Sequence, residues 1–227
     1  MGKNGTLIRL DLIYAKEILM IEPAKFALFV GVSWVLIVAP GPDMFYVITR
    51  GMAHGSKAGI VSAVGVICGI LVHTMAAALG TTLILQTSAF AFLIVKYLGA
   101  IYLIYLGIKT WRDKSIFSLQ IPTSDASFRA IFWQGVLSNV LNPKIAIFFL
   151  AFLPQFVDKG SSQVPLQMAV LGLTFAGFGL CFLVVVGYSA GAIGGWLTRR
   201  PNYARFSQRL AGVILIGLGV RLALAER

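Results

Sequence analysis

The sequence predicts an all-α integral membrane protein in which six transmembrane helices form two inverted repeats of three helices. Its composition is the first observation. Hydrophobic residues make up 58% of the 227 residues and charged residues only 12%, about half the charged share of a soluble domain. The second is a series of apolar segments, each near the roughly 20 residues that cross a bilayer. The third is a pair of proline motifs that interrupt the first and the fourth of these segments.

Polar connections separate the predicted spans. The spans comprise, in chain order, residues 26–49, 57–85, 90–111, 128–157, 164–193 and 206–224. The connection at 86–88 is short, whereas the polar stretch at 113–127 has no apolar run and is predicted to be a cytoplasmic loop. Residues 23–112 therefore form the first three-helix repeat, and residues 128–227 form the second.

Residues 1–22 precede the first span as a leader that does not cross the membrane. Charged residues interrupt its apolar stretches too often for a bilayer crossing or for a cleaved signal peptide. Either the leader is an amphipathic helix at the membrane surface, or the functional chain starts at Met20 and the leader is expendable.

An internal repeat relates the two halves. Residues 98–109 read LGAIYLIYLGIK and residues 210–221 read LAGVILIGLGVR. Both contain LI-x-LG followed by an apolar residue and a cation, which pairs the third span with the sixth and the first with the fourth. Because each half holds an odd number of spans, the halves cross the membrane in opposite directions. Such inverted repeats bind their substrate near the bilayer midplane.

Both interrupted spans contain a helix start at membrane depth. Residues 39–43 read APGPD and residues 141–144 read LNPK. In each motif a good N-cap residue, Gly41 or Asn142, precedes a proline, which is tolerated at the first position of a helix and breaks its interior. A helix N-terminus there offers unpaired N–H groups and a positive dipole end to an anionic group. The substrate-binding residues predicted from these motifs are Pro40, Gly41, Pro42, Asp43, Asn142, Pro143 and Lys144.

Each motif ends in an ionisable residue, and such a residue at membrane depth is a functional-site hypothesis. Asp43 either caps the helix, receives a substrate ammonium group or carries a coupling proton. Lys144 lies where the helix dipole disfavours a cation, so it either extends to the interface or needs a carboxylate. The repeat makes Asp43 and Lys144 equivalent positions. We therefore hypothesise an ion pair between them that a zwitterionic substrate replaces.

Four further polar residues within the spans are candidates. His73, near the middle of the second span, is a candidate for proton coupling together with Asp43, because imidazole titrates near neutral pH. Alternatively, His73 hydrogen-bonds a neighbouring backbone group. Gln134, Asn139 and Gln155 lie in the fourth span as secondary candidates, either at the site or in hydrogen bonds between helices.

Lysine and arginine residues predict the orientation. They are concentrated in the connections after the first, third and fifth spans, whereas the opposite connections hold little beyond Lys159. The positive-inside rule places the first set in the cytoplasm and both termini outside. Cations in the leader oppose this assignment, and a start at Met20 removes most of them. The net charge of +11 thus reflects topology signals and contacts with anionic lipids, and no nucleic acid is expected as a partner.

The sequence lacks the motifs of an enzyme. It holds no nucleophile motif, no phosphate-binding glycine loop and no cluster with metal-ligand spacing. We therefore predict neither an enzyme nor a cofactor. A passive channel is an alternative from another class, although few polar side chains recur on one helical face as a channel lining requires.

Several motifs together resemble the lysine exporter and homoserine/threonine resistance family (LysE/RhtB) of bacterial amino-acid efflux proteins. They are APGPDM at 39–44 followed by RGMAHGSKAG at 50–59, NVLNPK at 139–144 with FFLAFLPQF at 148–156, and LG-x-x-YL-x-YLG at 98–107. The resemblance covers the chain from Met20 to the C-terminus. It implies a six-helix exporter of the bacterial inner membrane, driven by the proton motive force, with amino acids or close derivatives as substrates. It leaves open whether the chain forms a homo-oligomer.

We therefore predict a secondary active transporter that exports small neutral amino acids or derivatives, of the threonine, homoserine or leucine type, by proton antiport and alternating access. A zwitterionic substrate would place its carboxylate at the N-terminus of a half-helix and its ammonium group near Asp43. The alternatives are a passive membrane channel and an exporter of a metabolite other than an amino acid.

Overall fold

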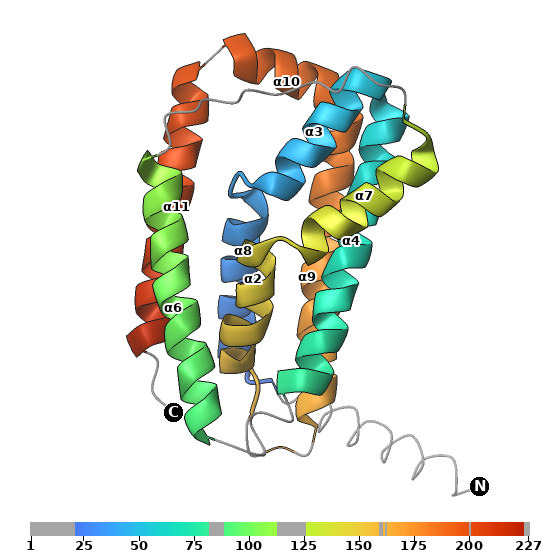
Figure 1. Ribbon diagram of the computed structural model, residues 1–227. Coiled ribbons are helices and arrows are strands. Elements are labelled where there is room, and N and C mark those ends of the chain that lie inside the picture. Colours follow the sequence, from blue (N-terminus) through green and yellow to red (C-terminus); the bar gives the residue numbers. More distant parts are fainter. Residues whose placement is uncertain are drawn as a thin grey trace, which may run out of the picture.

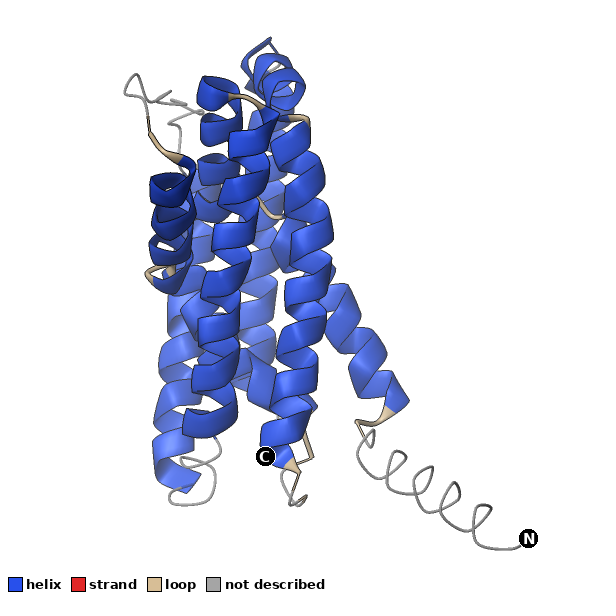
Figure 2. Ribbon diagram, turned by 90° about the vertical axis from the view of Figure 1, so that its right-hand side faces the viewer, coloured by secondary structure: helices blue, strands red, loops and turns tan. Residues whose placement is uncertain are grey.

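A computed structural model describes residues 21–81, 89–112, 126–158, 161, 163–199 and 201–224. Within these residues the chain forms helices joined by short turns, and no strand occurs among them. Most of the helices run along one common direction (Figure 2). The predicted all-α class is confirmed. Residues 1–20 of the predicted leader at 1–22 and most of the predicted loop at 113–127 lie outside the described residues.

Both predicted helix breaks occur, and they bend the chain by the same angle. The first broken span consists of α2 (Pro23–Val38) and α3 (Pro42–His54), bent by 47°. The second consists of α7 (Phe128–Val140) and α8 (Pro143–Ile147), which continues through the π-helical turn η2 (Phe148–Phe152) and the 3-10 turn η3 (Leu153–Phe156), and it is also bent by 47°. In each case the second helix begins at the predicted proline, whose fixed φ suits that position.

The unbroken helices flank these bent spans (Figure 1). They are α4 (Ser56–Ala76) with the π-helical turn η1 (Ala77–Thr81), α6 (Ala89–Arg112), α9 (Val164–Tyr188) and α11 (Pro201–Leu224). Among the described residues, three helices are long and apolar enough to cross a membrane, and each bent pair adds one candidate span, giving up to five. The sixth crossing stays a prediction. Helix α11 is the helix that contains the predicted sixth span.

The predicted end of the fifth span at residue 193 is wrong. Helix α9 ends at Tyr188, and after a turn at Ser189 a separate helix, α10 (Ala190–Arg199), lies across the end of the bundle between α9 and α11 (Figure 1). The Ser56 hydroxyl at the start of α4 donates to the carbonyl of Tyr188 at 2.8 Å. This bond gives a carbonyl in the last turn of α9 a partner from another helix, so the helix can end there.

Two antiparallel helix pairs, α4 with α9 and α6 with α11, pack backbone against backbone (Figure 1). At Gly59 of α4, a Cβ would collide with the carbonyl of Gly187 on α9. At Gly107 of α6, a Cβ would lie 2.7 Å from the carbonyl of Gly212 on α11, and at Gly219 of α11 it would lie 2.8 Å from that of Ala100. Small residues permit such close approach between membrane helices. Gly107 and Gly219 are equivalent in the sequence repeat, and both lie in the α6–α11 contact.

The two ends of the bundle differ in charge. The connection from α3 to α4, the end of α6, the start of α7 and helix α10 lie at one end (Figure 1), where Lys57, Lys109 and Arg112 are exposed. We call this the cationic end. The orientation of this end toward the cytoplasm stays a prediction.

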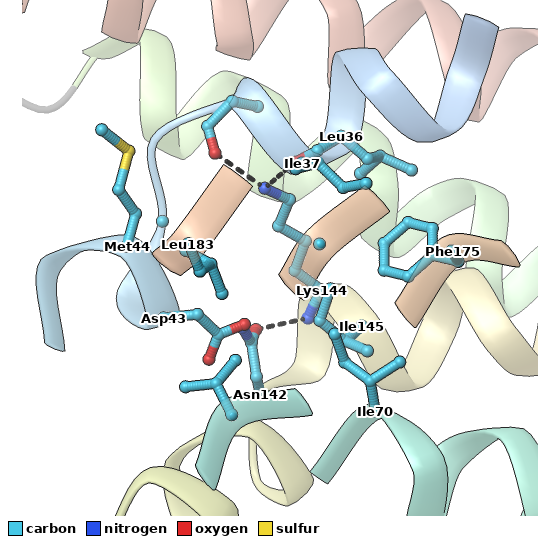
Figure 3. Close-up of a pocket in the computed structure, with 14 residues that line it drawn as sticks. Leu36, Ile37, Asp43, Met44, Ile70, Asn142, Lys144, Ile145, Phe175 and Leu183 are labelled. Carbon is cyan, nitrogen blue, oxygen red and sulfur yellow. Dashed lines mark hydrogen bonds between the residues drawn. The ribbon is translucent and has the colours of Figure 1, made fainter. Parts of the chain in front are cut away.

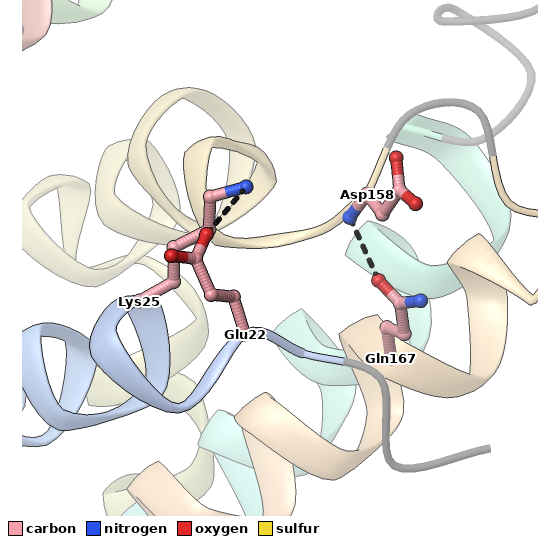
Figure 4. A network of polar contacts seen from close by, with 4 residues as sticks. All are labelled: Glu22, Lys25, Asp158 and Gln167. Atoms are coloured by element: carbon pink, nitrogen blue, oxygen red, sulfur yellow. Dashed lines mark hydrogen bonds and ion pairs between the residues drawn. The ribbon is translucent and has the colours of Figure 1, made fainter. Parts of the chain in front are cut away.

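At the other end, polar contacts hold the helix starts (Figure 4). Glu22 and Lys25 form an ion pair of 3.5 Å at the start of α2, which is exposed and stabilises little. The backbone N–H of Asp158 donates to Oε1 of the buried Gln167 at 2.8 Å, which ties the chain after η3 to the first turns of α9. Helix α2 also contacts α9 directly, because the rings of Trp34 and Phe178 lie 5.4 Å apart.

We expect a Gly59→Ala substitution to lower the stability of the protein in detergent by about 1–3 kcal/mol, because the added methyl group overpacks the α4–α9 contact. Gly31→Ala on α2 is the matched control, since a Cβ there has nothing within 4 Å and alanine favours a helix. Thermal unfolding of both variants tests this. Equal melting temperatures would contradict the close contact.

Candidate functional site

The two helix breaks meet at one cavity of about 40 Å³. It lies between the broken spans and the unbroken helices α4 and α9 (Figure 3). Its walls are formed by Leu36, Ile37, Ala39, Gly41, Asp43, Met44, Val66, Ile70, Asn142, Lys144, Ile145, Phe175, Gly179 and Leu183. The structure thus brings together Gly41, Asp43, Asn142 and Lys144, which the sequence predicts as site residues from segments about a hundred positions apart.

Asp43 is held by two side-chain amides. Its Oδ2 accepts hydrogen bonds from Nδ2 of Asn139 at 2.9 Å and from Nδ2 of Asn142 at 2.8 Å. Its other oxygen, Oδ1, is buried and has no hydrogen-bond partner. Asn139, a secondary candidate from the sequence, therefore contacts the key carboxylate directly. The carboxylate is fixed in place by uncharged donors, and one of its oxygens is available to a further donor.

Lys144 caps the C-terminus of α2 from the other half of the chain. Its side chain is only 7% exposed, and Nζ donates to the carbonyls of Leu36 at 2.9 Å and Ala39 at 3.0 Å (Figure 3). Carbonyls in the last turn of a helix have no partner within the helix. The hypothesised ion pair with Asp43 is not formed. Both charges lie at the same cavity, but each is hydrogen-bonded to uncharged groups, because the break in the first span creates carbonyls that need a donor.

The N-termini of the two half-helices at the cavity differ. At α8, Oδ1 of Asn142 accepts from the backbone N–H of Lys144 at 3.0 Å, so the predicted N-cap is confirmed. At α3, the N-cap is Gly41. Glycine has no side chain, so no side chain caps the start of this helix. A Cβ on Gly41 would lie 3.5 Å from Nζ of Lys144. The uncapped N-terminus of α3 and the Lys144 ammonium group therefore lie beside each other, and both favour an anion.

His73 caps the other broken helix. Its Nε2 lies 3.1 Å from the carbonyl of Asn139 in the last turn of α7, where only a protonated Nε2 can form the bond. The ring is buried beside Phe149 and does not line the cavity. This is the backbone contact that the sequence left as an alternative to proton coupling. Hydrogen bonds link His73 to Asp43 through Asn139, whose backbone carbonyl lies next to His73 and whose side-chain amide binds the carboxylate.

Gln134 lies away from the cavity, in a polar contact between α3 and α7. Its Oε1 accepts from Nη2 of Arg50 at 2.6 Å, and the Tyr46 hydroxyl donates to the carbonyl of Ile131 at 2.6 Å. The Arg50 guanidinium also lies 5.5 Å from the centre of the Tyr46 ring. Sequence reasoning treated Arg50 as a topology signal and missed Tyr46, since neither lies in a break motif. These side chains join α3 to α7 between the cavity and the cationic end.

The remaining predicted residues shape the backbone. Gln155 donates from Nε2 to the carbonyl of Ala151 at 3.4 Å, within its own segment. Pro40, Pro42 and Pro143 do not line the cavity; the latter two start the half-helices.

Away from the cationic end, buried aromatic residues pack together behind the cavity wall, to which Phe175 belongs. We call Phe29, Phe148, Phe152, Phe156 and Phe175 the phenylalanine cluster; all are buried, and adjacent rings lie 5.1–6.4 Å apart. A cavity of about 40 Å³ holds roughly three water molecules. An amino acid needs several times this volume, so the elements around the cavity must separate before a substrate of that size can enter.

Comparison with known proteins gives one family. A family model described as LysE type translocator matches residues 34–226. The chain is 31% identical to a leucine efflux protein of Klebsiella pneumoniae over 197 residues, which cover 86% of this chain and 92% of the relative. It is 32% identical to an uncharacterized membrane protein of Vibrio cholerae over 193 residues (85% and 93%), and 29% identical to the uncharacterized membrane protein YrhP of Bacillus subtilis over 209 residues (87% and 97%). No solved structure matches the chain.

We expect Lys144→Met to destabilise the protein, because it leaves the carbonyls of Leu36 and Ala39 buried without a donor. Each unpaired carbonyl costs about 1–3 kcal/mol. Lys57→Met, at an exposed lysine of the cationic end, is the matched control. Thermal unfolding in detergent compares the two variants, and a Lys144→Met protein as stable as the control would contradict the capping role.

Proposed function

Because the chain belongs to the family of LysE type translocators and is an amino-acid efflux transporter rather than an enzyme, we propose that it exports small neutral amino acids or close derivatives, of the leucine, threonine or homoserine type, across the bacterial inner membrane. One observation carries the proposal. The two helix breaks converge on a cavity that presents one carboxylate, one ammonium group and an apolar wall, which are the three features that recognise a neutral amino-acid zwitterion.

Each end of the zwitterion has a complementary group. The substrate ammonium group binds Oδ1 of Asp43, the oxygen that has no partner within the protein. The substrate carboxylate binds beside Gly41, where it contacts both the N-terminus of α3 and Nζ of Lys144. A lysine ammonium group has three N–H donors, and carbonyls occupy two of them, so one is available to the carboxylate.

The charges also oppose other substrates. A cationic side chain would meet Lys144 in a site with a single carboxylate. An anionic side chain would meet Asp43 without a second cation. The side-chain part of the cavity is apolar, which suits leucine. That the Klebsiella pneumoniae relative is named a leucine efflux protein supports an aliphatic substrate.

Transport proceeds by alternating access between two closures. At the cationic end, which faces the cytoplasm in this proposal, the Tyr46 and Arg50 contacts between α3 and α7 open to admit substrate. At the other end, the phenylalanine cluster opens to release it. One repeat rocks against the other around the site at the helix breaks, as in other transporters built from inverted repeats.

Proton antiport supplies the energy. Asp43 is the first candidate for the coupling group, because it lies at the cavity and binds the substrate ammonium group in this proposal. A proton and a substrate ammonium group then compete for the same carboxylate, which couples their movements in opposite directions. His73 is the second candidate, through its link to Asp43 by way of Asn139.

We expect proteoliposomes holding the purified protein to exchange radiolabelled leucine, threonine or homoserine saturably. Asp43→Asn should abolish this counterflow, because it removes the charge that receives the substrate ammonium group. Asp158→Asn is the control, because Asp158 is exposed and lies at the end of the bundle opposite the cationic end. Exchange by Asp43→Asn at the wild-type rate would remove the assigned role of the carboxylate. Non-saturable flux would favour a channel.

We further expect an imposed pH gradient to accelerate net amino-acid transport, and substrate movement to carry protons the other way. A pH-sensitive dye inside the liposomes measures the proton flux. Counterflow needs no net proton movement and therefore does not itself report coupling. An Asp43→Glu variant that retains both counterflow and gradient-driven net transport would support a carboxylate as the coupling group. Net transport that is indifferent to the gradient would contradict proton antiport.

A further inference from the structure

The apolar wall of the cavity comes from the two unbroken helices that flank it. Phe175, Gly179 and Leu183 line it from α9 and follow one another at four-residue spacing, which places them on one face of the helix. We call these three residues the α9 stripe. Val66 and Ile70 line the cavity from α4 at the same spacing. The charged groups of the cavity lie only on the broken spans.

The α9 stripe has a notch at its centre, because the residue there is a glycine. Gly179 carries no side chain, and a Cβ there would lie 3.2 Å from Cδ1 of Ile67 and 3.7 Å from Cδ1 of Ile70 on α4. One methyl group would thus fill the gap between the two helices at this level. The residues one turn away on either side, Phe175 and Leu183, are large and buried.

Two neighbouring aromatic rings pack against the side chain of Phe175. Its ring lies 5.1 Å from that of Phe148 and 5.6 Å from that of Phe149, and the side chain is 1% exposed. Such packing holds the ring in place as long as the phenylalanine cluster is closed. The Phe175 ring, itself part of the phenylalanine cluster, therefore bounds one side of the notch.

We propose that the α9 stripe is the side-chain subsite of the transporter and decides which neutral amino acid it exports; this inference rests on the proposed function. The broken spans hold the ammonium and carboxylate groups that all amino acids share, and the α9 stripe reads the group in which they differ. The branched side chain of leucine places one terminal methyl group in the notch at Gly179. Aromatic side chains meet the ring of Phe175 and are rejected.

Two substitutions test the subsite by changing its volume in opposite directions. Gly179→Ala fills the notch, and Phe175→Leu removes the aromatic ring but keeps an apolar side chain. Gly177→Ala is the matched control on the same helix, because a Cβ there has nothing within 4 Å. The measurement is competition of alanine, leucine and phenylalanine against the exchange of labelled substrate in proteoliposomes. Ratios of inhibition constants do not depend on how much protein is folded.

Wild-type protein and Gly177→Ala should prefer leucine to both alanine and phenylalanine. Gly179→Ala should shift the leucine-to-alanine ratio toward alanine by about tenfold, and Phe175→Leu should shift the leucine-to-phenylalanine ratio toward phenylalanine by a similar factor, as expected for one hydrophobic group in a pocket. Exchange with unchanged ratios in both variants would overturn the subsite alone. A wild-type protein that exchanges no amino acid would overturn the subsite and the proposed function together.

Discussion

Backbone groups exposed by two helix breaks at membrane depth are the constraint on which the site depends. In an apolar environment an unpaired carbonyl costs several kcal/mol, so each break needs a donor from elsewhere in the chain. Lys144 supplies it to Leu36 and Ala39 at the end of α2, and His73 supplies it to Asn139 at the end of α7. The arrangement is reciprocal in one respect. The residue that caps the first broken span belongs to the motif that breaks the second, so the two halves hold each other in register around the cavity.

This constraint also explains why the opposite charges of the cavity do not neutralise each other. Lys144 is held by carbonyls and Asp43 by the amides of Asn139 and Asn142. A direct ion pair would consume the interactions that the proposed zwitterionic substrate needs, and that substrate would have to separate the two charges before binding. Uncharged partners fix both groups yet leave each with capacity for one more hydrogen bond, which is the kind of preorganisation that lowers the cost of binding.

Local rules were enough to predict the breaks, because proline after Gly41 or Asn142 determines backbone geometry whatever surrounds it. They also identified Asp43 and Lys144, because charge within an apolar span is conspicuous. They failed where an interaction depends on the fold. The partners of Lys144 are carbonyls, which every residue carries. The α9 stripe is apolar among apolar residues, so no pattern in the sequence separates Phe175 from a lipid-facing phenylalanine. The end of α9 at Tyr188 depends on a hydroxyl from α4, which hydropathy does not register.

The contact between Trp34 and Phe178 joins the half-helix that Lys144 caps to the helix that carries the α9 stripe. Phe178 directly precedes Gly179, and Trp34 lies less than one turn from Ile37 in the cavity wall. Any separation of α2 from α9 changes the surroundings of this indole, whose fluorescence responds to its neighbours. This indole thus offers an intrinsic optical signal of the proposed opening, which can be followed without attaching a label.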